Sequence, residues 1–573
     1  MSEHQLGSVP TPPVKVLSKS LEKPDSFNPV RFFVVLNKNT QWLAVFIALL
    51  FAIPLLSLIV EAITGDGESF QHIKETVLSD YVLNTVGLML LVGLIVLLIG
   101  VPLAWLLATC QFTGKRFFNW ALVLPLAMPA YLVAYTYTDL LDYAGPIQLF
   151  LRSLFNWQSP DDYWFFDIRS LGGASVVIAL VLYPYVYLMS KASFLEQNAN
   201  LSQAARMLGA SAWRSFFKIS LPLAKSAIIA GCALVMMETI ADFATVHYFA
   251  VSTLTTAIYD TWLGHYDLAS AAKLSCLMVL GVMALLTLEQ LQNKNKRVNN
   301  DAKAAQQKLS YQLTGWKNWL AFGACATVLF FAFILPSIQL SVYAFDYFAE
   351  SWTNEAFVYT MNSLKIAVLT ALIALVIALV LNHSYRVNSR TGQFVALKSA
   401  SNGYAIPGTV LAIGILIPLS FVDHQINELA ETWSLQTPGL LLSGTVFAII
   451  CTHVVRFVAI ANKSIESSYQ KISPSLDMAA KTLGKNNWTL LLKVHLPLVR
   501  KSTLVAALLI FVESMKELPA ALLLRPFDFQ TLPTYVYQYA SDEQLELAAV
   551  GALLIVLIGL IPLIFINRSI EQE

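Results

Sequence analysis

The sequence predicts an all-α integral membrane protein with about twelve transmembrane helices in two parallel six-helix halves. Of its 573 residues, 57% are hydrophobic and only 13% are charged, and the mean hydropathy is +0.62. These values lie outside the range of soluble domains. Apolar segments of about 20 residues recur along the chain, and one polar stretch between them occurs twice.

The chain begins with a segment, residues 1–40, in which prolines and lysines come before any apolar run: Pro10, Pro12, Pro13, Lys15, Lys19, Lys23 and Pro24. It lacks the apolar core of a cleavable signal sequence, so we expect a disordered cytoplasmic tail. A first transmembrane domain is expected at 41–292, a polar cytoplasmic linker at 293–317 and a second transmembrane domain at 318–573. The predicted spans are 42–63, 85–108, 118–140, 171–191, 226–249 and 269–291 in the first half, and 319–343, 364–381, 404–421, 440–461, 503–524 and 547–566 in the second.

Loop charge predicts the orientation, because Lys and Arg concentrate in cytoplasmic loops. Basic residues fill alternate loops, at 115–116, 191–225, 294–317, 386–398 and 463–501. The intervening loops are acidic or nearly free of Lys and Arg. Both termini are therefore predicted in the cytoplasm.

The polar stretch 201–222 follows the fourth predicted span and recurs at 476–497, after the tenth. In the second copy, Ser473 can cap a short helix that begins at Pro474, and Gly484 suits the left-handed turn that ends it. A plain cytoplasmic turn does not need such repetition, so we predict a docking surface that is used twice. The two copies share Ala204, Ala205, Gly209, Leu221 and Pro222 in the first and Ala479, Ala480, Gly484, Leu496 and Pro497 in the second.

The duplication extends beyond these stretches. Asn84-Thr85 is matched by Asn362-Ser363, and residues 128–134 are matched by 406–412. Because each half has an even number of spans, both halves share one membrane orientation and form a parallel repeat.

Motifs of several enzyme classes are missing from the sequence. There is no G-x-x-x-x-G-K-[ST] loop to hold phosphates, and no H-E-x-x-H, G-x-S-x-G or Cys/His ligand cluster. The five cysteines have no paired spacing, so neither disulfides nor a metal site are expected. We predict that the chain is not an enzyme by itself.

Ionisable residues inside spans are costly and are therefore functional candidates. The fifth span carries Glu238 and Asp242, and its counterpart carries Glu513, Lys516 and Glu517. One interpretation is a translocation pathway lined by Glu238, Asp242, Glu513 and Glu517, which suits a hard cation that prefers oxygen ligands. The other is a set of ion pairs between helices, with Lys516 as the partner of a carboxylate. Both interpretations stay open.

Many tyrosines lie near the predicted ends of spans. Tyr131, Tyr135, Tyr183 and Tyr187 are among those expected in the interfacial aromatic belt. His247, beside Tyr248, is expected to pack rather than to react.

The repeated stretches resemble the E-A-A-x-x-x-G signature, followed by I-x-L-P, of permease subunits of bacterial ATP-binding-cassette importers. This resemblance implies the type I importer permease fold, in which loops 196–225 and 470–501 form coupling helices that insert into a groove on the ATPase. The leading Glu is replaced by Gln203 and by Met478, with Asp477 one place earlier, so its role does not carry over. The matching residues are Gln203, Ala204, Ala205, Gly209, Ile219, Leu221 and Pro222, and Met478, Ala479, Ala480, Gly484, Val494, Leu496 and Pro497.

Segments 238–249 and 515–527 are similar to the ferric iron branch, in which both permease halves are fused in one chain. The resemblance implies a subunit of the bacterial inner membrane that moves ferric iron from periplasm to cytoplasm and binds no cofactor itself. ATP and Mg²⁺ belong to the partner ATPase. The implied partners are two copies of this cytoplasmic ATPase, a periplasmic iron-binding protein and membrane lipid, and no nucleic acid.

Two alternatives are kept. Related fused permeases carry thiamine, phosphonates or polyamines, because a separate binding protein selects the substrate. A secondary transporter driven by an ion gradient also explains twelve spans and intramembrane carboxylates, but it does not explain the matched polar loops. Dependence on an encoded ATPase distinguishes these classes.

Overall fold

The computed structural model describes residues 40–197, 205, 207–209, 211–293, 311–387, 391–485 and 487–571. The predicted tail, apart from Thr40, and most of the predicted linker lie outside these residues. The described part is almost entirely helical, and its one sheet pairs Cys110–Gln111 (β1) in parallel with Tyr311–Gln312 (β2). Within it, 11 helices are long and apolar enough to cross a membrane, and one bent pair raises the number to 12. The predicted fold class is confirmed.

The first half contains six spans and several shorter helices. Its helical elements are α2 (Thr40–Thr64), α3 (Glu68–Thr76), α4 (Leu78–Thr109), α5 (Lys115–Ala121), η1 (Leu124–Ala127), α6 (Ala130–Leu141), α7 (Pro146–Phe155), η2 (Pro160–Asp162), α8 (Leu171–Glu196), α10 (Ala212–Ser215), η3 (Phe216–Ser220), α11 (Leu221–Ala241), α12 (Ala244–Tyr248), α13 (Leu254–Tyr259) and α14 (Leu268–Asn293).

The second half repeats this order. Its elements are α15 (Trp316–Leu329), η5 (Phe330–Ile334), α16 (Leu335–Asp346), α17 (Phe348–Ser351), α18 (Asn354–Val387), α19 (Thr391–Asn402), η6 (Gly403–Ala405), α20 (Gly408–Thr432), α21 (Val446–Gln470), α22 (Pro474–Thr482), α23 (Asn487–Leu490), η7 (Leu491–His495), α24 (Leu496–Lys516), α25 (Pro519–Leu524), α26 (Leu532–Ser541) and α27 (Leu545–Glu571).

The spans are apolar on all sides, as helices in lipid are. In α4, for example, Leu90, Leu94 and Leu98 follow one another at four-residue spacing and are all exposed. Because residues four apart share a helix face, they form a stripe that faces lipid. The opposite side of α4 packs on α8 and α11.

The matched pairs Asn84-Thr85 and Asn362-Ser363 make equivalent hydrogen bonds in the two halves. Asn84 Nδ2 donates to the Ser252 carbonyl at 3.0 Å, and Asn362 Nδ2 donates to the Gln530 carbonyl at 3.1 Å. The next residue then accepts from the first backbone N–H of a short helix: Thr85 Oγ1 from α13 at 3.0 Å, and Ser363 Oγ from α26 at 2.7 Å. These N–H groups have no partner within their own helices. The repeat is therefore structural as well as sequential.

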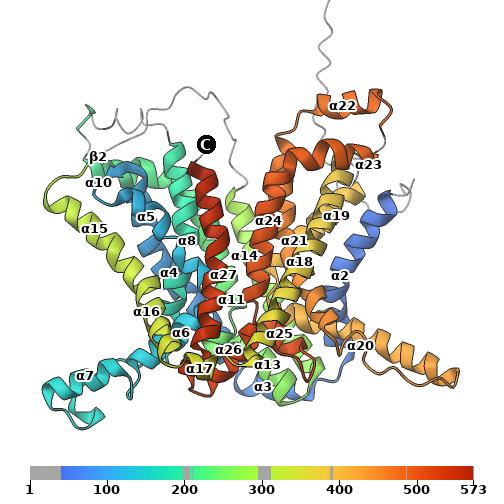
Figure 1. Cartoon of the computed structure of the whole chain (residues 1–573), viewed down its shortest axis with the longest axis horizontal. Helices are drawn as coiled ribbons and strands as arrows, with labels where there is room; N and C mark the ends of the chain where they lie inside the picture. The colour runs from blue at the N-terminus through green and yellow to red at the C-terminus, as the bar shows by residue number, and fades with distance from the viewer. Residues whose placement is uncertain are drawn as a thin grey trace, which may run out of the picture.

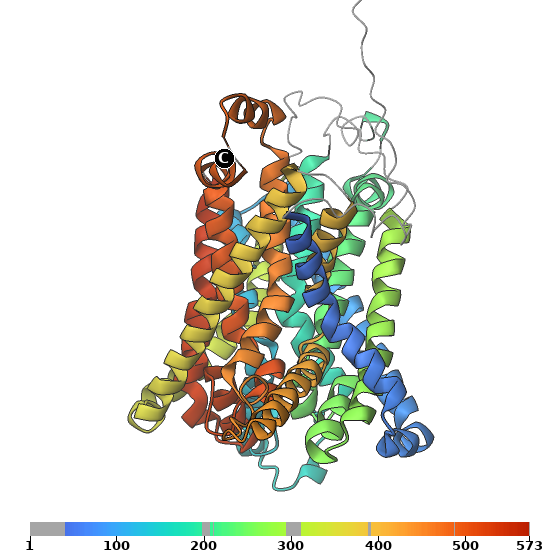
Figure 2. The ribbon, with the colours of Figure 1, turned by 90° about the vertical axis from the view of Figure 1, so that its right-hand side faces the viewer.

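The first span of each half lies against the other half. Helix α2 packs on α19 and α20 of the second half, and α16 packs on α6 of the first half. Figure 1 shows α2, in blue, on the side of the second half, and Figure 2 shows it crossing that face obliquely. The Ser57 hydroxyl donates to the Gly414 carbonyl at 2.6 Å, and the Tyr137 hydroxyl donates to the Phe331 carbonyl at 2.6 Å. The halves are therefore joined by exchanged helices as well as by the chain between them.

Several predicted spans are wrong in detail. The third, 118–140, is two helical segments bent by 90° around Met128 and Pro129. The fifth, 226–249, and the eleventh, 503–524, are each interrupted near their outer ends, and the tenth begins only at Val446. At two of these breaks, side chains from other elements donate to the freed carbonyls: Lys516 Nζ to Leu126 and Thr255 Oγ1 to Asp242. Such compensation is the condition for breaking a helix in a membrane.

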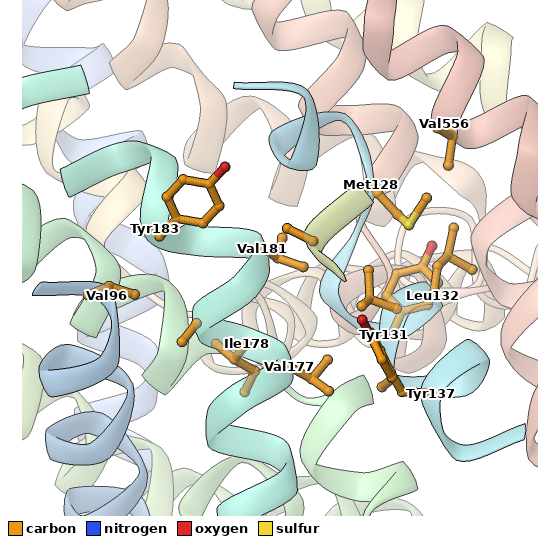
Figure 3. Close-up of a cluster of buried hydrophobic side chains, with 14 of the residues drawn as sticks. Val96, Met128, Tyr131, Leu132, Tyr137, Val177, Ile178, Val181, Tyr183 and Val556 are labelled. Atoms are coloured by element: carbon orange, nitrogen blue, oxygen red, sulfur yellow. The ribbon is translucent and has the colours of Figure 1, made fainter. Parts of the chain in front are cut away.

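The prediction that the tyrosines form an interfacial belt is also wrong. Tyr135, Tyr183 and Tyr187 are fully buried, and Tyr131 is nearly so. Figure 3 shows Tyr131 and Tyr183 within the cluster of apolar side chains around α8. The Tyr183 hydroxyl donates to the carbonyl of Leu122, directly after α5, at 2.8 Å. His247 packs as expected, with its Nδ1 2.9 Å from the Tyr537 hydroxyl.

Candidate functional site

The second repeated loop has the shape that its sequence predicts. Ser473 Oγ accepts from the Ser475 N–H at 3.3 Å, and Pro474 is the first residue of α22. Gly484 follows the helix with a φ of +69°, a left-handed conformation that glycine adopts readily. The Lys485 N–H donates to the Ala480 carbonyl at 3.1 Å, and the Gly484 N–H donates to the Lys481 carbonyl at 3.0 Å. These two bonds are the Schellman end of a helix.

Helix α22 presents apolar side chains outward. Met478 is 61% exposed and Leu483 is 75% exposed, and Ala479 is also on the outer side. Ala480 is buried. Figure 1 shows α22 beyond the ends of the spans. The exposed side is therefore a short apolar ridge that the rest of the described chain leaves open.

The inner side of α22 is tied to the bundle by charged groups. Asp477 accepts from Arg386 Nε at 2.7 Å with one oxygen and pairs with His495 Nε2 at 2.8 Å with the other. Burial disfavours the charge on Asp477, but the hydrogen bonds from His495 and Arg386 outweigh this effect and hold its pKa below the ordinary value. Asp477, one place before the position of the signature Glu, is thus paired within the chain.

Arg386 also holds the end of α21. Its two terminal nitrogens donate to the carbonyls of Tyr469, at 2.6 Å, and Ile472, at 3.0 Å. His495, in turn, lies with its Nδ1 3.0 Å from His383 Nδ1 of α18. Helix α22 is therefore connected to α18, η7 and the end of α21 through directional polar contacts.

The first loop is partly described. Gln203 and Ala204 lie outside the described residues. Ala205 is half-buried, and Gly209 has a φ of +84°, which matches Gly484. In both loops a π-helical turn, η3 or η7, leads into a long helix that begins with Leu-Pro: Leu221-Pro222 in α11 and Leu496-Pro497 in α24.

The described part of the first loop packs on aromatic rings. Trp105 lies 5.0 Å from Phe216 and 6.1 Å from Trp213, measured between ring centroids. In the aligned halves, Trp105 corresponds to His383 and Ser220 corresponds to His495. The two loops therefore have similar backbones but different supports.

A cavity of about 140 Å³ lies where the two halves meet. Elements of both halves line it: η1, α6, α8 and α11 from the first, and α21, α24 and α25 from the second. Its wall includes all four carboxylates that the sequence analysis singled out together with two basic side chains: Glu238, Asp242, Glu513, Glu517, Arg456 and Lys516.

Two of these carboxylates mark the breaks in the fifth spans. Asp242 and Glu517 leave α11 and α24 with nearly equal backbone angles, φ −70° and ψ 125° against φ −69° and ψ 116°. Asp242 accepts from the Thr245 N–H at 2.9 Å, and Glu517 from the Ala520 N–H at 3.4 Å. Each carboxylate thus caps the short helix that follows, where negative charge stabilises the N-terminus.

Lys516 forms the ion pair predicted for it. Its Nζ lies 2.8 Å from Glu513 Oε1 and also donates to the Leu126 carbonyl of η1 at 3.3 Å. Since η1 belongs to the first half and α24 to the second, Lys516 bridges the halves beside the cavity.

Arg456 is a residue that the sequence analysis missed. It lies on α21, with Nη1 2.6 Å from Glu517 Oε2, and both side chains are buried. A Cβ on Gly408 would lie 2.4 Å from Glu517 Oε1 and 2.8 Å from Arg456 Nη1, so glycine makes room for the pair. The counterparts of Gly408 and Arg456 in the first half are Ala130 and Val181. An arginine inside a predicted span was the available signal.

The charge on the wall is asymmetric. The second half contributes two carboxylates and their two basic partners, whereas the first half contributes Glu238 and Asp242 and no basic side chain. Among the described residues, no group of three or more His, Cys, Asp or Glu side chains is arranged to hold a metal ion. The cavity is thus an acidic chamber rather than a closed coordination site.

Comparison with known proteins shows similarity to membrane components of transport systems. Residues 100–298 match the family model of the binding-protein-dependent transport system inner membrane component. An Fe(3+)-transport system permease protein of Haemophilus influenzae is 24% identical over 543 residues, which cover 92% of this chain and 98% of that protein.

Two further relatives differ in the share of the chain that they match. A ferric transport system permease protein of Actinobacillus pleuropneumoniae is 22% identical over 478 residues, 79% of this chain and 65% of that protein. The molybdenum transport system permease protein of Escherichia coli is 31% identical over 202 residues, 34% of this chain and 83% of that protein.

Proposed function

Because the chain belongs to the inner membrane components of binding-protein-dependent transport systems, we propose that it moves ferric iron from periplasm to cytoplasm. The observation that supports ferric iron as the substrate is the length of chain over which the relatives align. The Fe(3+)-transport permease aligns over nearly the whole of both chains, whereas the molybdenum permease aligns with only a third of this one.

ATP hydrolysis in separate subunits drives this movement. Two copies of a cytoplasmic ATPase dock on the loops 196–225 and 470–501 and hold ATP and Mg²⁺. The exposed apolar ridge of α22, with Met478, Ala479 and Leu483, supports this role, because an apolar contact on a rigid helix can transmit a rigid-body movement. In the first loop, Met207 and Leu208 beside Gly209 are similarly exposed.

The cavity carboxylates line the translocation pathway in this proposal. Four carboxylates face two basic side chains, so the wall favours a cation over an oxyanion. Ferric iron is a hard cation that prefers oxygen ligands. The Tyr131 hydroxyl and Arg456 Nε also lie on this wall, both buried and without a partner in the described residues, and can meet water or cargo.

The topology follows from the same account. The domains are 41–292 and 318–573, joined by a cytoplasmic linker at 293–317, and both termini are cytoplasmic. Figure 1 supports this arrangement, since the start of α2 and the end of α27 lie at the same end of the bundle as α22. A periplasmic iron-binding protein delivers the cargo at the opposite end.

Uptake in cells tests the substrate. Cells without their own iron importers receive this chain, its ATPase and its binding protein, and accumulate radiolabelled ferric iron. Excess unlabelled ferric iron is expected to compete, whereas molybdate and thiamine are not. Uptake of labelled molybdate or thiamine in place of iron would contradict the proposed substrate but would still be consistent with a transport permease.

A further inference from the structure

Two segments leave the bundle sideways at the end opposite α22. We call residues 146–166 the first arm and residues 421–441 the second arm. The first consists of α7 and the segment after it, and the second consists of the end of α20 and the segment after it. Figure 1 shows α7 and the end of α20 extending in opposite directions from the two sides of the molecule.

The first arm exposes a large apolar surface. In α7, Leu154 is 58% exposed, and beyond the helix Trp164 is 87% exposed. The one basic residue of α7, Arg152, is turned back: it donates to the Tyr143 carbonyl at 2.8 Å and lies over the Tyr143 ring. The other exposed apolar residues of this arm are Ile147, Leu149, Phe150, Phe155 and Phe166.

Aromatic rings are concentrated at the end of the first arm. Trp157 stacks on Tyr163 at 4.6 Å between centroids and on Phe155 at 4.7 Å, and Phe165 stacks on Phe166 at 4.7 Å. Trp and Tyr are enriched where a protein crosses the boundary between lipid and water, because their rings are apolar and their polar atoms reach the headgroups.

The second arm has the same character with a different sequence. Trp433 is 72% exposed on it. Its acidic residues Glu428 and Glu431 are also exposed, so the helix has a charged side and an apolar side. The other exposed apolar residues of this arm are Phe421, Val422, Leu429, Leu435, Leu440 and Leu441.

Both arms are held in shape by an amide side chain. Gln148 accepts from the Tyr163 hydroxyl at 2.5 Å and donates to the Leu141 carbonyl at 2.8 Å, which pins the returning segment to α7. In the second arm, the Asn427 amide donates to the Gly439 carbonyl at 3.1 Å and accepts from its N–H at 3.0 Å. The arms are thus built elements whose apolar sides face away from the rest of the described chain.

We propose that both arms lie in the lipid–water interface of the outer leaflet. Two amphipathic segments leave the spans sideways, near the ends of the spans, and carry aromatic and leucine side chains, as helices that lie in the membrane plane do. Lipid surrounds both sides of the bundle, and contact with lipid requires an apolar surface but no particular sequence. The two arms share apolar character and differ in sequence, as this requirement allows. The occupant of the apolar surface is therefore phospholipid.

Spin labels in proteoliposomes test this proposal. Cysteines replace Leu154 and Leu429, one in each arm, in the full chain reconstituted without its ATPase, so that α22 stays open to water. The native cysteines are buried or half-buried in the described structure, so labelling favours the introduced ones. Leu98→Cys, on the lipid face of α4, and Lys481→Cys, on exposed α22, are the matched controls for lipid and water.

Labels on both arms are expected to collide with oxygen as the Leu98 label does, to be shielded from an aqueous nickel chelate, and to lie about 5–10 Å inside the headgroups. Collisions with the nickel chelate like those of the Lys481 label would overturn the proposal. Nickel accessibility that disappears only when the binding protein is added would also overturn it, in favour of a protein docking surface. Quenching of tryptophan fluorescence by brominated lipid gives a second readout: it is expected to fall when Trp164 and Trp433 are changed to Phe.

Discussion

Arg386 Nε lies 2.7 Å from Asp477 Oδ2, and this contact joins the end of α18 to the inner side of α22. Arg386 binds the carbonyls of Tyr469 and Ile472 at the same time. The guanidinium group of Arg386 therefore links α22 to α18 and to the carbonyl groups at the end of α21.

Asp477→Asn is expected to weaken transport and leave ATP hydrolysis running. The change removes the charge but keeps the shape, and a charged hydrogen bond of this kind contributes about 1.5–3 kcal/mol. Iron moved per ATP hydrolysed is expected to fall about tenfold or more. The exchanged variant Asp477→Arg with Arg386→Asp is expected to recover part of the loss, and an exchanged variant no better than Asp477→Asn would argue against the contact.

Gly484→Val is expected to uncouple transport without unfolding the chain. A left-handed φ costs a β-branched residue about 1–2 kcal/mol, and a Cβ here meets nothing within 4 Å, so the effect is on the loop backbone alone. Gly484→Asn, which tolerates this conformation better, is expected to lose less. Gly323→Ala, at an equally open helical position, is the control. Equal transport by the Val and Asn variants would contradict the requirement for the left-handed turn.

Gly408→Ala is expected to destabilise the second half. The added Cβ would lie against Glu517 and Arg456, and overpacking of this kind costs about 1–3 kcal/mol. The reciprocal change, Ala130→Gly, meets no ion pair and is expected to cost about 0.5–1 kcal/mol. Thermal unfolding of the purified variants in detergent compares the two. A smaller shift in Tm for Gly408→Ala than for Ala130→Gly would contradict the packing described.

Removing one member of the buried pair is expected to be worse for folding than removing both. Arg456→Met leaves Glu517 buried and without its partner, which costs about 3–5 kcal/mol. The double variant with Glu517→Gln is expected to recover most of the folding but to transport iron several-fold more slowly, because the pathway loses a carboxylate. Transport by the double variant at the wild-type rate would contradict a role in the pathway and would show that Arg456 and Glu517 serve only the structure.

The local shape of the second repeated loop could be predicted from its sequence. Ser473, Pro474 and Gly484 act through bonds to their own neighbours, so no knowledge of the rest of the fold was needed. The repeat could also be predicted, because matched residues are visible in the sequence. In the structure, the matched residues Asn84 and Asn362 make equivalent hydrogen bonds to distant carbonyls.

Features that depend on distant parts of the chain could not be predicted. Asp242 and Glu517 sit in segments that look like uninterrupted apolar spans, and the breaks are stable only because residues from other elements pack around them. The tyrosines near the predicted span ends are buried against elements that are distant in the sequence. Tyr183, for example, donates to the Leu122 carbonyl.

The most direct test of the account is iron uptake by proteoliposomes that hold this chain and its ATPase, with the loaded binding protein outside. Ionophores dissipate every ion gradient, and ATP is either enclosed or omitted. The account predicts that iron accumulates only with enclosed ATP and that the ionophores leave its rate unchanged. Accumulation that needs no ATPase and stops when the gradients are dissipated would contradict it.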